Sequence, residues 1–282
     1  MMEERELTPA EAAKRSILKK YRKTIWGPFI AALKQYKLIS EGDRIAVCMS
    51  GGKDSALLAV LMKTLTEHSE VPFSCEYICM DPGYSEANRQ RLEENARLLE
   101  IPLKIFETNV FRVSSNHSEG SPCYLCARMR RGHLYNFAKS LGCNKIALGH
   151  HFSDVIETTL MGMLWGAQLQ GMLPRLRSTN FEGMELIRPL YRIREDDIVA
   201  WARYNSLEFL GCACSMTESS EIDESKSKRR ETKELIRRLR AEGNADIEKN
   251  IFNSLHNVSV DTFVGYDIDG EEHSFLEKLE DK

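Results

Sequence analysis

Residues 44–65 decide the fold of this chain. They read Arg44-Ile45-Ala46-Val47-Cys48-Met49, then Ser50-Gly51-Gly52-Lys53-Asp54-Ser55, and then continue from Ala56 to Leu65 at helical spacing. The short apolar run suits a buried strand. It leads through a glycine loop directly into a helix, and in parallel α/β sheets such a loop lies outside the carboxyl end of its strand, where ligands bind.

The loop from Ser50 to Ser55 has the chemistry of a phosphate site. Two glycines let the backbone approach an oxyanion, and the amides and dipole of the helix start favour negative charge there. The serine hydroxyls can donate, and Lys53 adds a positive charge. The loop is not a Walker A motif, because Val47 stands in place of its first glycine and Asp54 in place of its Ser or Thr. A plain Gly-Gly turn is the alternative.

Further strands and helices alternate along the chain. Strands are predicted over 73–80, 103–107 and 145–149, with 184–188 as a candidate fifth strand, and helices over 85–99, 124–141 and 153–165. Strands alternating with helices of this length are typical of βαβ units. The predicted fold class is therefore α/β, a doubly wound parallel sheet covered on both faces.

Four regions are predicted. Residues 1–40 form an N-terminal helical segment, which begins at a capping box of Thr8 and Glu11 and is interrupted at Gly27-Pro28. Residues 41–215 form the α/β domain with the cysteine motif. Residues 216–260 form a charged C-terminal helical cap, and residues 261–282 an acidic, loosely held tail.

Composition excludes several classes of protein. The chain has 282 residues, 42% of them hydrophobic and 29% charged, and no apolar run long enough to span a bilayer. Eight cysteines without an export signal indicate a reducing compartment, so a cytoplasmic protein without membrane contact is expected. The formal charge of −3 argues against unspecific coating of nucleic acid, although local basic clusters can still contact RNA.

Cysteines at two places can bind metal. Cys123 and Cys126, at the start of the predicted helix over 124–141, place two thiols three residues apart, so both can converge on one ion. Cys212 and Cys214 follow far downstream. Three cysteines from the two places can hold an iron–sulfur cluster, whereas four can close a zinc site. The other four cysteines lie in or beside predicted strands and are expected in the core.

The cysteine helix is also strongly basic. Arg128, Arg130 and Arg131 stand within four residues, which is favourable where they face anions or RNA phosphates; a solvated basic helix face is the alternative. His150 and His151 end the strand over 145–149, and one of them can reach ATP phosphates or both can serve only as hydrogen-bonded structure. Asp154 can act in the active site or only stabilise the start of the next helix.

Three motifs together resemble a known family. The loop from Ser50 to Ser55 is similar to the pyrophosphate loop of the PP-loop ATP pyrophosphatases. Together with Pro122-Cys123-Tyr124-Leu125-Cys126-Ala127-Arg128-Met129-Arg130-Arg131-Gly132 and Ala147-Leu148-Gly149-His150-His151, it resembles the tRNA 2-thiocytidine synthetases. The likeness runs from about Leu18 to Cys214.

This resemblance implies an ATP- and Mg²⁺-dependent tRNA thiolase. ATP would adenylate the C2 oxygen of an anticodon-loop cytidine, and sulfur would replace it. The implied catalytic residues are Lys53, Asp54 and Asp154. The implied ATP-binding residues are Ser50, Gly51, Gly52, Lys53, Asp54, Ser55, Met80, Gly149 and His150. The family has two consecutive acidic residues where this chain has Ser153-Asp154, so only Asp154 carries over.

The resemblance also implies a 4Fe–4S cluster on three cysteines. Cys123 and Cys126 match its first two ligands. The third is expected to be Cys214, with Cys212 as the alternative, because this chain has C-x-C where the family has C-x-x-C. Sulfur would reach the cytidine as sulfide on the open iron or as a cysteine persulfide. Both routes are open.

The implied partners are tRNA and a sulfur donor. Arg128, Arg130 and Arg131 would contact the anticodon loop, and a cysteine desulfurase is an expected type of sulfur donor. A homodimer is compatible with the sequence. Two other functions stay open: a PP-loop ligase resembling lysidine synthetase, for which the paired cysteines have no role, and a zinc-stabilised RNA-binding module without catalysis.

Overall fold

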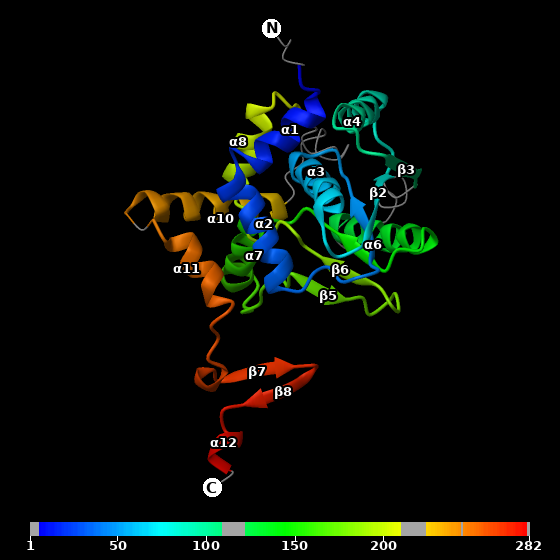
Figure 1. Ribbon diagram of the computed structural model, residues 1–282. Coiled ribbons are helices and arrows are strands. Elements are labelled where there is room, and N and C mark those ends of the chain that lie inside the picture. Colours follow the sequence, from blue (N-terminus) through cyan, green and yellow to red (C-terminus); the bar gives the residue numbers. More distant parts are fainter. Residues whose placement is uncertain (1–5, 109–121, 210–223, 244, 281–282) are drawn as a thin grey trace. The chain divides into compact units, whose positions relative to one another are not determined.

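The computed structural model describes residues 6–108, 122–209, 224–243 and 245–280, without the side chains of 122–130, 224–227, 278 and 280 (Figure 1). The chain divides into two compact units. One comprises Met1–Val155 and Met172–Ser227, and the other Ile156–Gly171 and Lys228–Lys282. In the part of the chain that the structure describes, no helix has both the length and the apolar character needed to cross a membrane.

The first unit contains a six-stranded sheet in the order β3-β2-β1-β4-β6-β5. Its strands are β1 (Arg44–Cys48), β2 (Ser74–Asp81), β3 (Leu103–Glu107), β4 (Lys145–Ala147), β5 (Arg175–Arg177) and β6 (Glu185–Ile187). All neighbouring strands pair in parallel except β5, which runs antiparallel to β6. The predicted α/β class and parallel sheet are confirmed, with the fifth candidate strand present as β6. The short edge strand β5 was not predicted.

The alternation of side chains along β1 explains why both faces of the sheet are covered. Ile45 and Val47 lie in a buried cluster with apolar residues of the helix that follows the glycine loop. Ala46 and Cys48 point to the other face, into a cluster with Tyr135 and its neighbours. Because successive strand side chains alternate between faces, a continuously apolar strand needs helices on both sides.

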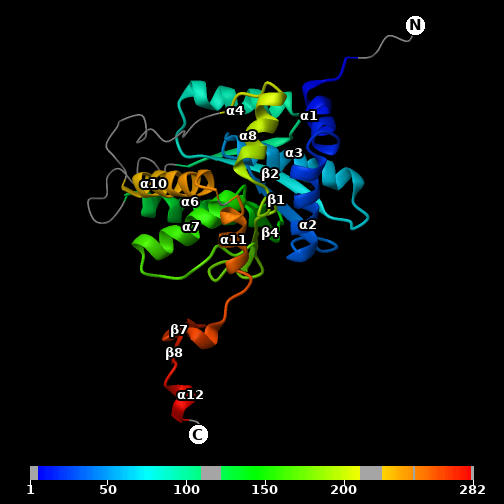
Figure 2. The same ribbon diagram turned by 90° about the vertical axis from the view of Figure 1, so that its left-hand side faces the viewer.

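The helices follow the predicted rhythm (Figure 1). They are α1 (Pro9–Leu18), the π-helix η1 (Arg22–Trp26), α2 (Gly27–Gln35), α3 (Lys53–His68), α4 (Glu86–Leu98), α6 (Pro122–Ser140), α7 (Phe152–Trp165), α8 (Glu195–Tyr204), α10 (Glu224–Ala241) and α11 (Ile247–Ser254). Figure 2 shows α2 and α6 on opposite sides of β1 and β4. Residues of α1, α2, α3 and α8 share one core cluster, and α6 contributes to the other.

The N-terminal segment confirms the predicted capping box. The Thr8 hydroxyl accepts from the Glu11 amide (3.2 Å), while the Glu11 carboxylate accepts from the Thr8 amide (2.9 Å). The helix is interrupted earlier than predicted, by a turn at residues 19–21 between α1 and η1, whereas Gly27 and Pro28 lie in the first turn of α2, which follows η1 directly. Buried Ile17, Ile25 and Phe29 tie this segment to the core of the first unit.

The second unit is highly charged. Glu157 is only 2% exposed and lies 3.9 Å from the Arg229 guanidinium and 3.7 Å from the Lys233 ammonium group of α10.

The charged segment predicted as helical is two helices, α10 and α11. After a 3₁₀ turn η2 (Val260–Thr262), the acidic stretch forms a hairpin of β7 (Gly265–Ile268) and β8 (Glu271–Ser274), followed by α12 (Glu277–Glu280). This hairpin was not predicted.

Candidate active site

The loop after β1 is built to expose its backbone. Gly51 has a φ of +82°, which favours glycine, and Gly52 is the N-cap of α3. The Ser55 hydroxyl holds the loop closed, because it accepts from the Ser50 amide (3.1 Å) and donates to the Gly52 carbonyl (2.9 Å). The first amides of α3 therefore point out of the loop, where an anion can bind them.

Lys53 is held between two carboxylates. Its ammonium group lies 3.1 Å from Asp54 Oδ1 and 3.1 Å from Glu195 Oε1 at the start of α8. Burial disfavours the charged ammonium, but Asp54 and Glu195 outweigh that effect and raise the pKa of Lys53 above its usual value. Lys53 is therefore charged and oriented before any phosphate arrives.

Asp54 has an oxygen suited to a metal ion. Lys53 Nζ donates to Oδ2 (3.2 Å), whereas Oδ1 is buried and has no hydrogen bond within the described part of the chain. Mg²⁺ in nucleotide sites usually takes one or two carboxylates together with the phosphates. Asp54 Oδ1, which lies 3.1 Å from Lys53 Nζ but accepts no hydrogen bond among the described residues, stands beside an anion-binding loop and fits that donor set.

His151 and Asp154 brace Asp54 from the far side of the site. His151 is 3% exposed, and its Nε2 lies 3.7 Å from Asp54 Oδ1. Asp154 accepts from the His151 amide (3.0 Å), and the Asp154 amide donates to His151 Nδ1 (3.4 Å). His151 Nδ1 also lies 3.4 Å from Asp154 Oδ2, so the ring stands between the carboxylates of Asp54 and Asp154. Asp154 thus stabilises the helix start and also lies in the site.

Gly149 allows the loop after β4 to approach the phosphate loop. A Cβ atom at this position would lie 3.2 Å from the Asp54 carbonyl carbon and 3.2 Å from the Ser55 amide nitrogen. Both are backbone atoms, which cannot move aside easily. The ends of β1 and β4 therefore meet at Gly149, where only a glycine fits without displacement.

One cavity of about 430 Å³ is lined by most of the predicted ATP-binding and catalytic residues, although Gly51, Gly52 and Lys53 are not among those that line it. Its polar wall consists of Ser50, Asp54, Ser55, Gly149, His150, Asp154 and Arg131. Its apolar wall consists of Cys48, Met49, Met80, Leu134 and Leu148. A concave site with one apolar and one polar, phosphate-binding wall can hold a nucleotide, with its base on the first and its phosphates on the second.

Some predicted site residues lie outside what the structure describes. Cys212 and Cys214 lie outside the described residues. Cys123, Cys126, Arg128 and Arg130 belong to the first turns of α6, but their side chains are not among those described. Among the described residues, no three His, Cys, Asp or Glu side chains form a metal-binding group.

The remaining cysteines belong to the core, as predicted, with one partial exception. Cys48, Cys79 and Cys143 are buried, and Cys75 is half-buried. Burial raises the pKa of Cys48 far above its usual value and that of Cys75 to about 12. Thiols with such pKa values are poor nucleophiles and poor metal ligands at neutral pH.

Glu195 and the role of His151 were not predicted from the sequence. Glu195 stands 142 positions after Lys53 in the chain. An acidic residue in the first turn of a helix usually serves the helix dipole, so no local pattern marks Glu195. The Glu195 amide donates to the Ser153 hydroxyl (3.2 Å), and this hydrogen bond connects α8 to the start of α7.

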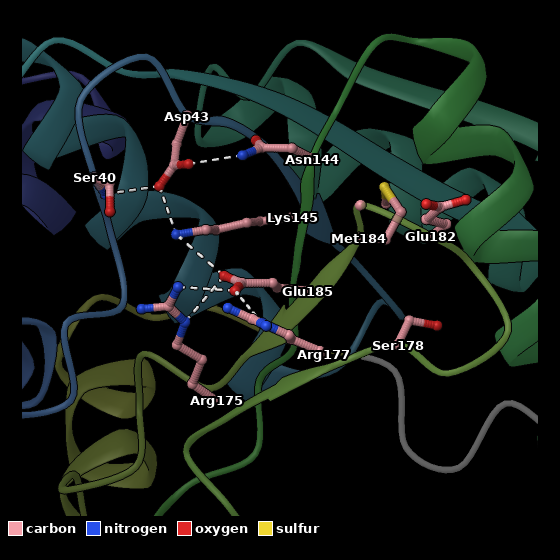
Figure 3. Close-up of a pocket in the computed structure, with 11 residues that line it drawn as sticks. Ser40, Asp43, Asn144, Lys145, Arg175, Arg177, Ser178, Glu182, Met184 and Glu185 are labelled. Carbon is pink, nitrogen blue, oxygen red and sulfur yellow. Dashed lines mark hydrogen bonds and ion pairs between the residues drawn. The ribbon is translucent and has the colours of Figure 1, made fainter.

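A second cavity of about 420 Å³ lies at the opposite edge of the sheet, where β1, β4 and β6 begin (Figure 3). Lys145 is 3% exposed and lies 2.7 Å from Asp43 and 3.5 Å from Glu185. Arg175 binds Glu185 through both Nε (2.9 Å) and Nη2 (2.8 Å). Asn144 donates to Asp43 (2.8 Å). These buried charges compensate one another, which marks a structural network.

Comparison with known proteins agrees with this site. The family model of the PP-loop domain matches residues 27–219. A tRNA-cytidine(32) 2-sulfurtransferase of Geotalea uraniireducens is 35% identical over 230 residues, which are 80% of this chain and 88% of that protein. A protein of the same name from Alcanivorax borkumensis is 32% identical over 255 residues, or 89% and 86% of the two chains.

A solved structure supports the fold. The U34-tRNA thiolase NcsA from Methanococcus maripaludis, described with its [4Fe-4S] cluster, aligns with a TM-score of 0.63 at 19% identity, covering 87% of this chain and 81% of that one. The sequence relatives cover most of both chains. The chain belongs to the PP-loop family and, within it, to the tRNA-cytidine(32) 2-sulfurtransferases.

Proposed function

We propose that this protein is an ATP-dependent tRNA sulfurtransferase that activates the C2 oxygen of a cytidine and replaces it with sulfur. One observation carries the proposal. Helix α6 contributes Arg131 and Leu134 to the nucleotide cavity, and its first turn contains Cys123 and Cys126. At a rise of 1.5 Å per residue, Cys126 is only about 8 Å along the helix from Arg131. This short distance supports the proposal that nucleotide and cysteines belong to one site.

ATP binding follows from the two walls of the cavity. Met49, Met80 and Leu134 offer apolar contact to a base, and the amides at the start of α3 bind phosphate oxygens. Lys53 adds a fixed positive charge where negative charge develops as pyrophosphate leaves. Mg²⁺, held by Asp54, would neutralise further phosphate charge when bound. The remaining residues keep these groups in place.

Adenylation solves the main chemical difficulty. The C2 oxygen of cytidine is amide-like and cannot leave as oxide, whereas AMP is a good leaving group once attached to it. The His151 ring lies behind Asp54, with Nε2 3.7 Å from Oδ1, and Asp154 holds the ring by the contacts at its Nδ1 side. His150 and Arg131 line the cavity beyond them. The cytidine is proposed to enter on this side.

Cys123, Cys126 and Cys214, with Cys212 as the alternative third ligand, are proposed to hold a 4Fe–4S cluster. The donor set fits, because Cys123 and Cys126 stand three residues apart in α6 and thiolates are the usual ligands of such clusters. A cluster on three cysteines would supply an open iron position for sulfide. The finer proposals are that Arg128, Arg130 and Arg131 contact the anticodon loop, that a cysteine desulfurase type of enzyme donates the sulfur, and that the protein works in the cytoplasm.

The test combines tRNA and protein measurements. A deletion strain should lose one thiolated cytidine in mass spectrometry of its tRNA nucleosides, and the wild-type gene should restore it. In the anaerobically reconstituted protein, Ala at Cys123, Cys126 or Cys214 should remove the brown colour and the thiolation. ATP binding should persist in each variant, because the phosphate loop lies elsewhere in the chain.

Cys212→Ala is the matched control and should retain both colour and activity. If Cys214→Ala retains iron while Cys212→Ala loses it, the third ligand is Cys212. Zinc in every variant and no iron after anaerobic reconstitution would show that the cluster proposal is wrong. An unchanged nucleoside profile in the deletion strain would contradict the function itself.

A further inference from the structure

Arg188 lies directly after β6, at the same edge of the sheet as the phosphate loop. Its backbone is fixed on both sides, because its amide donates to the Pro174 carbonyl (2.9 Å) and its carbonyl accepts from the Tyr191 amide (3.1 Å). Its Nη1 donates to the Leu173 carbonyl. The guanidinium is therefore held by backbone groups and does not swing freely.

One edge of this guanidinium has no partner. Nε is buried, and within the described ranges neither Nε nor Nη2 makes a hydrogen bond and no carboxylate lies within ion-pair distance. Arg175 in the same sheet shows the satisfied case, with Nε and Nη2 both on Glu185. The Nε–Nη2 edge is the fork that binds two oxygens of a carboxylate or a phosphate.

The charges around Arg188 make it an anion site. Burial and the like charge of Arg131 lower the pKa of Arg188 to about 10, although Tyr191, Tyr135 and Asp154 act in the other direction. Arg188 still carries a full charge at neutral pH. Arg131 also has no ion pair within the residues that the structure describes. Arg188 is half-buried and its charge has no carboxylate partner among the described residues, which is unfavourable, while Arg131 is exposed and adds a second positive charge nearby. Together the two charges favour an anion beside Arg188.

We propose that Arg188 and Arg131 bind a backbone phosphate of the RNA substrate next to the target nucleoside. This inference rests on the proposed function and adds a substrate-binding residue to it. The phosphates of ATP are the other source of such an anion, but position argues against them. Arg188 follows β6, two strands from the phosphate loop of β1, a lateral distance of about 10 Å. The apolar wall at Met49 and Met80 lies on the other side, over β1 and β2.

The experiment compares tRNA and ATP binding in Arg188→Gln and Arg188→Lys. Full-length, anaerobically purified protein is titrated with an unmodified tRNA transcript that has a cytidine at position 32, between 50 and 200 mM salt. Loss of a charge-assisted fork should weaken tRNA binding by about 10-fold or more in Arg188→Gln and reduce the salt slope by about one unit. Arg188→Lys should weaken binding less and keep the slope, since its charge remains. ATP affinity without tRNA should stay unchanged.

Arg177→Gln is the matched control, because Arg177 lies in the same sheet at its opposite edge and its side chain is 92% exposed. It should bind tRNA like the wild type. Equal tRNA affinity of wild type and Arg188→Gln, with thiolation intact in the wild type, would overturn the role of Arg188 alone. A parallel loss of ATP affinity in Arg188→Gln would reassign the anion to ATP and also overturn it. A wild-type protein that does not bind the tRNA would refute the proposed function as well.

Discussion

The two edges of the central sheet have the same types of charged residues but use them differently. At the edge where β1, β4 and β6 begin, Lys145 and Arg175 have carboxylate partners on Asp43 and Glu185 (Figure 3). At the edge where these strands end, Arg188 lacks a carboxylate partner within the described residues. A charge network that is complete stabilises the fold, whereas one that is incomplete has capacity for a ligand. The two edges are distinguished by whether their charges are compensated and not by the presence of charge alone.

The largest expected effect is a loss of stability at the edge where β1, β4 and β6 begin, which is called the closed edge here because its charges are compensated. Lys145→Met leaves Asp43 and Glu185 buried without their shared cation, so the free energy of unfolding should fall by about 3–5 kcal/mol. Urea denaturation measures it. Lys104→Met is the matched control: Lys104 lies 2.7 Å from Glu76 but is 49% exposed, so its loss should change the stability by at most about 1 kcal/mol. Equal losses in both variants would mean that burial does not matter at this edge.

The next effect is a loss of activity at the open edge, where β1, β4 and β6 end and the phosphate loop lies. Lys53→Ala combined with Asp54→Ala should reduce tRNA-dependent pyrophosphate release by about 10²–10³-fold, because charge stabilisation at the leaving phosphates is lost. The urea midpoint should remain close to that of the wild type. Lys63→Ala, on the exposed side of the same helix, should release pyrophosphate normally. Unchanged release in the double variant would exclude the loop from the chemistry.

The third effect sharpens the comparison at Lys53, a cation of the open edge that does have carboxylate partners. Glu195→Gln should raise the KM for ATP by about 3- to 10-fold, since the ion pair that orients Lys53 is lost but is partly exposed to solvent. The value of kcat should change less. Asp196→Asn, one residue further along α8 and exposed, should leave KM unchanged. Similar KM values in both variants would remove Glu195 from the site.

The smallest expected effect is the loss of stability at acidic pH that Asp43 causes. Burial alone would raise the pKa of Asp43, but hydrogen bonds from Lys145, Asn144 and the Ser40 amide outweigh it and hold that pKa below its usual value. The stabilisation by Asp43 is therefore fully present above the pKa of the unfolded chain, about 3.9, and is lost as the pH falls through the lower folded value. Between pH 5 and pH 3 the urea midpoint should fall more in the wild type than in Asp43→Asn. Parallel curves would contradict this.

Much of this organisation follows from local sequence patterns. The apolar run of β1, the glycine loop and the alternation of strands and helices predict the sheet and the position of the phosphate site, because each pattern expresses a backbone preference over a few residues. Ser55, Gly149 and Asp154 were found in the same way, from motifs beside strand ends. The structure brings them to one cavity because the carboxyl ends of parallel strands share one edge.

What could not be predicted depends on distant pairs or weak signals. Glu195 acquires its role only from Lys53, which stands 142 positions earlier, and Arg188 acquires its role from the lack of a carboxylate partner among the described residues. Neither stands in a local motif. The strand β5 has three residues, too few for a periodic pattern. The hairpin of β7 and β8 did have a signal in its turn: Asp269 and Gly270 have φ values of +55° and +86°, and Asp-Gly is typical of two-residue hairpin turns. The acidic composition around it obscured that signal.

The ion pair between Lys53 and Glu195 also has a consequence for synthesis of the protein. The ribosome adds about 5–20 residues per second, so the 142 positions between the two residues take about 7–28 s to translate. During that time the growing chain already contains the phosphate loop and β1, but not the carboxylate that orients Lys53. The nucleotide site is therefore completed late, after α8 has emerged, and an unfinished chain cannot hold ATP in the geometry of the mature enzyme.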